Sequence, residues 1–542
     1  MKAVSPGSHL QAAAPGWPPA KPSMTCAGSC AGSDAAASLP SHLPGFVLAS
    51  AARASAGSRG QAFVRHALIF GLANLLALAS NGVLTFLLPR WLSLEGYGLY
   101  RLFLLYGGFA GALHLGLLDG ALIRWAAAPR RRLPRELRPS LSFLLITHLL
   151  LLAPAMAVLW FCFRQQWWFF VAAATLAYAV IWNPAILGQF ALQADKSFGL
   201  LSAATVLPPA LLLAAVAAAH QQHRLTLPTV FGSCLGGWLV AGVVAWIGLL
   251  HNYRPKKHLS RERSGRRLWR TGTCNVGAGW SVLLAGFVTS LAFALDRVVV
   301  SLSFPLGDFA IYSLAATAMA LVNAMTLSLS RVVFPYLSDG MNAAERRRAY
   351  GWGECCLLTL WAIALGGYFP LRLLILRWLP AYVASLPVLR PLLLATGFTA
   401  AIYVLHANYF RIHRRQRTLL LASSTGLAAA AVLLVLARRS GSLTAMAWAM
   451  LAAIALWWLV DEWLLARLTG RGAREILRSL AFVAASAGCF LIGTSAFSHG
   501  SGLAVYGVTA GCLIALAWGR TLRSLPRLPA RAFLNFGFRR TE

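Results

Sequence analysis

The sequence predicts an all-α polytopic membrane protein with about 14 transmembrane helices. Of its 542 residues, 58% are hydrophobic and only 12% are charged, whereas soluble domains carry roughly 25% charged residues. The apolar residues form blocks of about 20, separated by short polar or basic stretches, and a helix of ~20 residues crosses a ~30 Å hydrocarbon layer. Backbone groups in lipid must pair within their own segment, which favours helices over the ~10-residue alternating strands of membrane barrels.

The elements follow from these blocks in chain order. Residues 1–60 are rich in Ala, Ser, Gly and Pro without periodicity, which predicts a disordered tail. Helices are predicted at 66–89, 98–126, 141–163, 167–192, 200–219, 227–250, 274–303, 309–336, 353–376, 386–410, 418–437, 443–466, 480–496 and 502–519. We expect a six-helix N-lobe at 61–250, a basic cytoplasmic linker at 251–273, a six-helix C-lobe at 274–466, and two further helices with a basic cytoplasmic C-terminus at 467–542.

The net charge of +33 is explained by membrane topology. With the N-terminus placed inside, 36 of the 48 lysines and arginines fall in cytoplasmic segments and seven in outer ones. Basic residues favour the cytoplasmic side, so both termini are predicted to be cytoplasmic. A nucleic-acid partner is excluded because no soluble basic module is present.

The two lobes contain similar motifs at a nearly constant offset. Tyr100 and Tyr312 follow related glycine-containing turns and lie 212 residues apart. Basic triplets at Arg130–Arg132 and Arg346–Arg348 are offset by 216. Because each unit has an even number of helices, this predicts a parallel repeat about an axis along the membrane normal, as in many secondary transporters. The alternative is chance similarity between short apolar motifs.

Several of these motifs resemble a known family. Leu94–Tyr100 and Leu115–Gly120 resemble the first lobe of Wzx-type oligosaccharide flippases, which belong to the MOP superfamily of MATE-like exporters. Phe309–Leu314 and Arg331–Ser338 are similar to their second lobe. The segment from Trp378 to Leu389 resembles the entry to their tenth helix, and the whole resemblance spans roughly residues 64–466.

The resemblance implies both an architecture and an activity. We expect two six-helix lobes around a central cavity in the bacterial inner membrane. The implied activity is alternating-access translocation of an undecaprenyl-pyrophosphate-linked oligosaccharide to the periplasmic face, for O-antigen (lipopolysaccharide) or exopolysaccharide biosynthesis. Membrane lipids, a coupling ion (H⁺ or Na⁺) and polysaccharide polymerases are the expected partners.

Ionisable residues within membrane helices are the first candidates for the transport site. Arg124 and Arg331 lie at equivalent positions late in their helices and are predicted to bind pyrophosphate, which suits the planar guanidinium. Snorkelling to the cytoplasmic headgroups is the alternative. Asp119 is predicted to bind a coupling cation or proton, or to pair with Arg331 or Arg124.

Polar uncharged residues supply the remaining candidates. Asn74, Asn81 and Asn323 are predicted to donate hydrogen bonds to sugar hydroxyls, although contacts between helices are the commoner use of such residues. Asp461 and Glu462 are expected at a solvated or interfacial position. The isolated histidines are expected to pack or to form hydrogen bonds. Nothing in the cysteine or histidine spacing predicts a metal site, and no cofactor or catalytic residue is expected.

Two other functions remain open at this stage. A MATE-type exporter of small molecules would have a similar helix count and repeat, but should place acids in its cavity. A membrane polysaccharide polymerase or ligase should have substantial outer loops, whereas those predicted here are short. No nucleotide-phosphate loop is present, so direct use of ATP is not expected.

Overall fold

The computed structural model describes residues 69–127, 133–253, 264–338, 343–413, 415–496 and 499–523; side chains from 324 to 343 are not described. The predicted tail at 1–60, the triplet Arg130–Arg132 and residues 254–263 of the predicted linker lie outside these residues. Within them every element is helical. Thirteen helices are long and apolar enough to cross a membrane, or 14 if one bent pair counts as a span. The predicted fold class is confirmed, and the chain is a multi-pass membrane protein.

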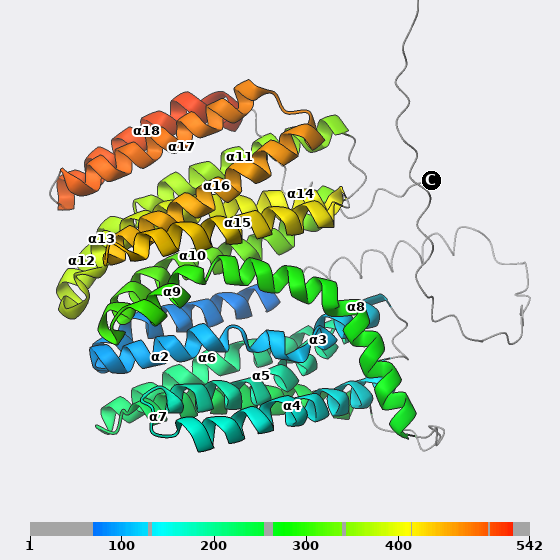
Figure 1. Cartoon of the computed structure of the whole chain (residues 1–542). Helices are drawn as coiled ribbons and strands as arrows, with labels where there is room; N and C mark the ends of the chain where they lie inside the picture. The colour runs from blue at the N-terminus through cyan, green and yellow to red at the C-terminus, as the bar shows by residue number, and fades with distance from the viewer. Residues whose placement is uncertain are drawn as a thin grey trace, which may run out of the picture. The chain divides into compact units, whose positions relative to one another are not determined.

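The first half of the described chain contains six spans. They are a first helix at Ile69–Trp91, α2 (Leu94–Gly107) continued by η1 (Ala110–His114) and α3 (Leu117–Ala127), α4 (Leu133–Phe163), α5 (Phe169–Asp195), α6 (Phe198–Gln221) and α7 (Leu227–Asn252). The helices α5, α6 and α7 pack on one another, and α4 covers α5 (Figure 1). A buried apolar cluster joins α3 to α7, with Leu144, Leu187 and Leu249 completely shielded from solvent.

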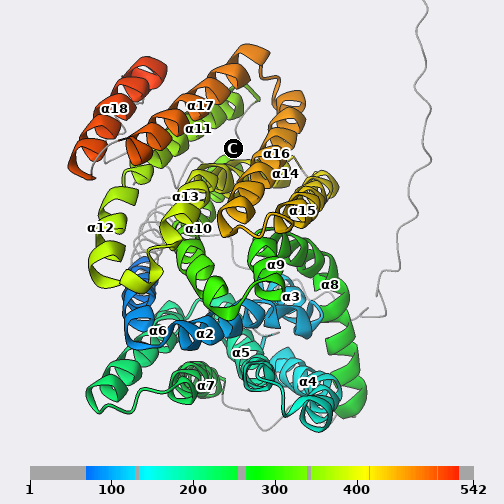
Figure 2. The same cartoon turned by 60° about the vertical axis from the view of Figure 1, so that its left-hand side comes forward.

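The second half begins with α8 (Ser264–Ala292), which starts earlier than the predicted 274. It continues with α9 (Leu295–Ser303), α10 (Leu306–Ser338), α11 (Ala343–Leu365), α12 (Tyr368–Trp378), η2 (Pro380–Tyr382), α13 (Ser385–Ala401), η3 (Ile402–His406), α14 (Ala407–Ile412), α15 (Gln416–Arg438) and α16 (Leu443–Thr469). The helix α13 lies between α10 and α16 and is the most buried span (Figure 2).

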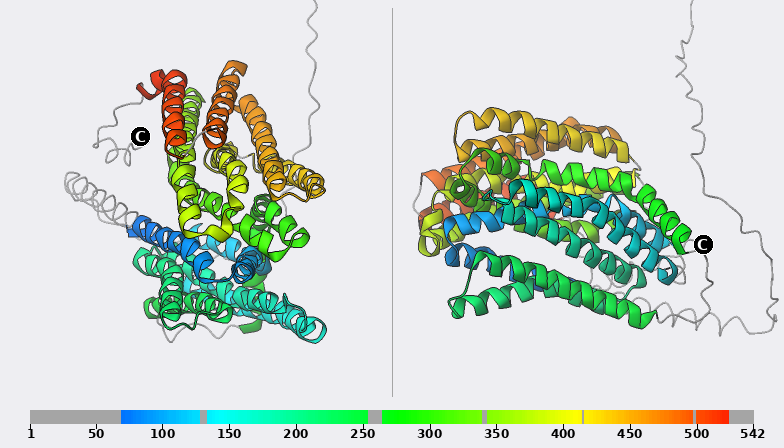
Figure 3. Two further views of the ribbon diagram at one scale, coloured as in Figure 1. Left: turned by 90° about the vertical axis from the view of Figure 1, so that its left-hand side faces the viewer. Right: turned by 60° about the horizontal axis from the view of Figure 1, so that its bottom comes forward.

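The last two spans, α17 (Ala473–Ser495) and α18 (His499–Arg523), form an antiparallel pair against α11 and α12. Figure 3 shows this pair on the side of α11 and α12, away from α4 and α7. Arg390 of α13 holds the pair in place, because its Nη2 donates to the Thr494 carbonyl at 2.9 Å and its Nε to the Tyr368 hydroxyl at 3.2 Å. Arg390 therefore joins α13 to α12 and α17.

The continuous helix expected at 98–126 is broken, and this corrects the prediction. The chain bends by 61° between η1 and α3. Leu115 and Gly116 adopt left-handed backbone angles, with φ of 53° and 84°. The backbone N–H of Gly116 donates to Nδ1 of His114 at 3.1 Å, which replaces a lost helical bond. The position requires glycine, because a Cβ on Gly116 would meet the backbone of Trp280.

The helix α8 contacts both halves of the chain. It packs on α3 and α4, and it also packs on α15. Its crossing with α3 is close because Gly120 faces the backbone of Asn275, and Gly279 faces the backbone of Gly116. Small residues at helix crossings allow backbones to approach in membranes, where there is no hydrophobic gain from helix association.

Candidate functional site

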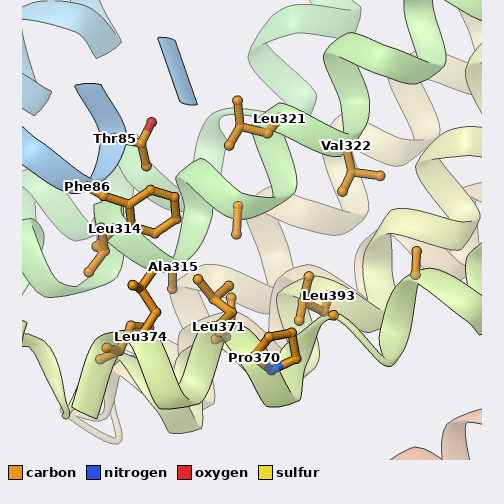
Figure 4. A pocket seen from close by; sticks show the side chains of 15 residues that line it. Thr85, Phe86, Leu314, Ala315, Leu321, Val322, Pro370, Leu371, Leu374 and Leu393 are labelled. Atoms are coloured by element: carbon orange, nitrogen blue, oxygen red, sulfur yellow. The ribbon is translucent and has the colours of Figure 1, made fainter. Parts of the chain in front are cut away.

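A pocket of about 550 Å³ lies between the first helix, α10, α11, α12 and α13. Its wall is apolar, as Figure 4 shows for Phe86, Leu314, Leu371 and Leu393. Among the described residues of the lining, only Thr85 has a polar side chain and none is ionisable. Such a pocket suits a hydrocarbon chain, whereas a sugar would find few hydrogen-bond partners in it.

A polar stripe on the first helix leads to this pocket. Asn74, Asn81 and Thr85 are spaced by seven and four residues, which places them on one helix face. Each bonds to a backbone carbonyl of its own helix: Asn74 Nδ2 to Phe70 at 2.7 Å, Asn81 Nδ2 to Ala77 at 2.9 Å, and Thr85 Oγ1 to Asn81 at 2.8 Å. Asn74 is half-buried and Asn81 is exposed. The amide oxygens of Asn74 and Asn81, two of the three predicted sugar-binding asparagines, take no part in these bonds.

Asn323 lies directly after Val322, which lines the pocket. Its Oδ1 accepts a hydrogen bond of 2.6 Å from the Thr399 hydroxyl on α13. The contact joins α10 to α13, which is the interhelix use that the sequence left open as an alternative. Asn323 is only half-buried.

Arg124 is engaged at the end of α3. Its Nη2 donates to Glu136 Oε1 on α4 at 2.9 Å, and its Nη1 donates to Asn275 Oδ1 on α8. Asn275 in turn donates to the Ser140 hydroxyl at 3.0 Å. The side chains of Arg124 and Glu136 are 20% and 10% exposed. Arg124 therefore joins α3, α4 and α8. Sequence analysis missed this contact because the partners Glu136 and Asn275 lie on other helices.

The two other ionisable candidates have different outcomes. Asp119 faces His114, with 3.9 Å between Oδ2 and Nε2. The expected partner Arg124 is paired with Glu136 instead. Because His114 Nδ1 accepts from Gly116, a neutral His114 directs its ring N–H at Asp119. Arg331 lies in α10, but its side chain is outside the described residues, and so is the predicted pairing with Asp119.

Close contacts join the two halves of the chain where the first helix ends and α10 begins. Leu94 packs on Gly307, and Gly98 on Leu306. Nearby, the Arg90 guanidinium lies 5.5 Å from the centre of the Trp378 ring. We call this end of the molecule the closed end. It is defined by the contacts of residues 90–106 in the first half with residues 301–307 and 378–382 in the second. Under the predicted topology, this is the periplasmic end.

The position expected for Asp461 and Glu462 is wrong. Their exposed fractions are 0% and 2%, so neither is solvated or interfacial. Both contact His406, which forms hydrogen bonds as expected of the isolated histidines. Two adjacent acids inside an apolar helix were a signal for this site, since such acids need buried partners. The pattern along one helix did not reveal those partners, His406 and Arg471, because they come from other parts of the chain.

Comparison with known proteins places the chain by fold. No family model matches the sequence, and no curated protein matches it either. Among solved structures, it is similar to the lipid II flippase MurJ in an inward closed conformation, at 10% identity and a TM-score of 0.62 over 85% of this chain and 100% of that one. It is also similar to an inward-facing multidrug resistance MATE family transporter of the MOP superfamily, at 14% identity and a TM-score of 0.53 over 75% of this chain and 96% of that one. The chain thus has the fold of MOP transporters.

Proposed function

We propose that this protein flips a polyprenyl-pyrophosphate-linked oligosaccharide across the bacterial inner membrane for surface polysaccharide biosynthesis. The observation that carries the proposal is the fold shared with a lipid II flippase over the full length of that protein. The flippase structure covers 85% of this chain and the MATE structure covers 75%. The difference in coverage is about the length of the α17–α18 pair. Wzx-like motifs support an oligosaccharide cargo.

The pocket supports a lipid-linked cargo over a small cation. An exporter of organic cations needs acids in its cavity, and the described residues of the lining contain none. A hydrocarbon chain gains about 25 cal/mol for each Å² of apolar surface that it buries. In the proposed arrangement, the polyprenyl chain occupies the apolar pocket and the glycan faces Asn74 and Asn81 on the same side of the first helix.

The pyrophosphate is assigned mainly to Arg331. Both terminal nitrogens of the Arg124 guanidinium already donate to protein groups, to Glu136 and to Asn275. We therefore assign Arg124 a positioning role between α3, α4 and α8. Asp119 remains the proposed coupling residue, with His114 as its neighbour.

The topology of the proposal places both termini in the cytoplasm, with the 61–250 and 274–466 lobes moving about the cavity between them. Two contacts between connections that are predicted to be cytoplasmic support this topology: Arg267 donates to the Arg135 carbonyl at 3.1 Å, and Arg347 donates to Glu475 at 2.8 Å. A polymerase that consumes glycan on the outer face is the proposed partner.

The test measures which membrane face holds the undecaprenyl-linked glycan in a deletion strain of the native host. Deletion should trap the intermediate on the cytoplasmic face, and the wild-type gene should restore its sidedness. Arg331→Ala should restore it poorly at equal expression. If deletion leaves sidedness unchanged in a strain without a second flippase, the proposal is wrong and a MATE-type exporter becomes the better assignment. Trapping on the outer face would instead indicate the polymerase or ligase.

A further inference from the structure

A buried cluster of charged side chains lies away from the pocket, where α11, η3, α16 and the turn before α17 meet. Each of its five residues has 8% or less of its surface exposed. We call them the buried charge cluster: Glu354, His406, Asp461, Glu462 and Arg471. Nothing in the proposed path for lipid and glycan uses these residues.

The members of the cluster are joined by short contacts. The His406 ring lies between two acids, with Nδ1 at 3.1 Å from Asp461 Oδ2 and Nε2 at 3.0 Å from Glu462 Oε1. Arg471 donates through Nη1 to Glu462 Oε2 and through Nη2 to Glu354 Oε2, both at 2.6 Å. The Tyr350 hydroxyl also donates to Glu462 Oε1 at 2.5 Å.

The charges of the cluster do not balance without an additional proton. Three carboxylates face one arginine and one histidine, so even with His406 protonated the sum is one negative charge. A net charge in an apolar interior is strongly unfavourable, and buried groups normally change protonation to avoid it. Binding one proton to a carboxylate brings the fully ionised cluster to neutrality.

Two oxygen atoms of the cluster are available for that proton. Glu354 Oε1 and Asp461 Oδ1 are buried and have no hydrogen-bond partner among the described atoms. Each belongs to a carboxylate whose other oxygen is already engaged, by Arg471 and by His406. A buried oxygen without a donor is costly as an anion, and protonation turns it into a hydroxyl group.

In the part of the chain that the structure describes, the ion pairs of the three cluster carboxylates are formed with His406 and Arg471. Glu475 lies 3.6 Å from Arg471 Nε, but it is 47% exposed and already paired with Arg347. Arg467 stacks over Trp463 on α16. Further ionisable groups lie on the elements around the cluster. They include Arg331 of α10, whose side chain is outside the described residues, Glu345, Arg346, Arg348, Tyr350, Cys355 and Cys356 of α11, Arg390 of α13, Tyr403 of η3, Tyr409 and Arg411 of α14, Arg415 and Arg417 beside α15, and Arg474 and Arg478 of α17.

We propose that the buried charge cluster is a proton-binding site of the second lobe, which holds one exchangeable proton shared between Glu354 and the His406–Asp461–Glu462 group. A proton fits better than a metal ion, because the guanidinium and the imidazole already occupy the positions that a cation would take. No group of His, Cys, Asp and Glu in the described residues has the geometry of a metal site.

The location allows protonation to act on helix packing. The cluster joins α11, α16 and the turn before α17 to η3. This π-helical turn lies between α13 and α14 in one continuous span. Such turns accommodate local shifts in a helix and often occur at functional sites. Loss of the proton leaves net charge in the interior, and water entry between these helices would relieve it. The coupling of this step to flipping rests on the function proposed above, whereas proton binding itself does not.

Infrared difference spectroscopy on the purified full-length chain in lipid nanodiscs tests proton binding directly. Spectra between acidic and alkaline buffer should contain a carboxylic-acid C=O band that shifts in D₂O. Glu354→Gln and Asp461→Asn should each weaken or abolish this band. The matched control is Glu475→Gln, which changes an exposed carboxylate beside the same arginine and should leave the band intact.

Three results would overturn the site: no deuterium-sensitive band, a band unchanged in both Glu354→Gln and Asp461→Asn, or a band that sodium removes at constant pH. Tyr350→Phe keeps the side-chain volume if the other variants fail to fold. It removes a donor from Glu462, so it should move the pH midpoint of the band upward. An unchanged midpoint in this variant would also count against the site.

The sidedness assay tests coupling separately. Glu354→Gln should leave glycan on the cytoplasmic face, whereas Glu475→Gln should complement the deletion. If Glu354→Gln loses the band but complements fully, the proton site is not coupled to flipping. If deletion itself does not change sidedness, the proposed function fails while the infrared result still decides the site.

Discussion

At the level of single residues, arginines within or beside the membrane helices join elements of the fold. Arg124 of α3, Arg390 of α13 and Arg471 in the turn before α17 each bond to groups on other helices. A guanidinium suits this role because its five donors lie in a fixed plane and can serve two partners at once. Charge within a span therefore signals a buried partner as readily as a substrate site.

Arg124→Ala should destabilise the protein by about 3 kcal/mol, because it leaves the Glu136 carboxylate buried without its partner. The measurement is the midpoint of thermal or denaturant unfolding in detergent. Adding Glu136→Ala should recover part of the loss, which a double-mutant cycle reports as coupling between the two residues.

The matched control for that pair is Arg347→Ala. Arg347 and Glu475 make an equally short contact of 2.8 Å, but both are more than 40% exposed. Surface pairs contribute about 0–1 kcal/mol, so this change should have little effect. Equal losses in both variants would show that Arg124 and Glu136 are not a stabilising buried pair.

At the level of helices, close packing depends on glycines at particular crossings. The α3–α8 crossing brings backbone against backbone at Gly120 and Gly279. Not every glycine of α8 has this role, since Gly277 and Gly286 face open space. Their difference gives an internal test of the crossing.

Gly120→Ala or Gly279→Ala should lower stability by about 1–3 kcal/mol, because the added methyl group meets the backbone of the facing helix. Gly277→Ala, two residues from Gly279, should be neutral or slightly stabilising, since alanine favours helix by roughly 1 kcal/mol over glycine. Unfolding midpoints compare the three variants. A loss for Gly277→Ala as large as that for Gly279→Ala would argue against the tight crossing.

The pocket is lined by α10 and the helices that pack on it, and a larger side chain at one position of α10 can fill it. Ala318→Phe places an aromatic ring in the pocket and should block glycan translocation in the sidedness assay without removing the protein from the membrane. Ala320→Phe on the same helix is the control, because Ala320 is exposed and does not line the pocket. Normal translocation by Ala318→Phe would exclude the pocket from the path of the lipid chain.

At the level of the whole molecule, the two halves of the chain touch at the closed end. Alternating access requires such contacts to separate during each cycle. The side chain of Leu94 is close enough that a Cβ added to Gly307 would lie 3.2 Å from its Cδ2. This position is suited to a cross-link between the halves.

Leu94→Cys combined with Gly307→Cys, in a chain without its nine native cysteines, should form a disulfide on oxidation. The bond should stop translocation, and a reductant should restore it. Gel mobility after cleavage between the halves measures the cross-link, and glycan sidedness measures activity. Each single-cysteine variant should be insensitive to oxidant, and full activity of the cross-linked protein would contradict movement at the closed end.

The sequence by itself determined the number of spans, their approximate positions and the alternation of basic connections. These properties follow from local hydrophobicity, because each span must pair its own backbone and match the bilayer thickness. Helix ends shifted where polar residues continue a helix beyond the apolar block, as at Ser264. The break at Leu115–Gly116 depends on a backbone conformation that no apolar pattern records.

Only the tertiary structure decided which polar groups meet. It paired Arg124 with Glu136 and not with Asp119, and it placed Asp461 and Glu462 on His406 instead of at an interface. These partners come from separate helices, so their contacts depend on how the helices rotate and cross. In a low-dielectric interior those contacts determine which charges are stable, and hydropathy along one helix carries no information about them.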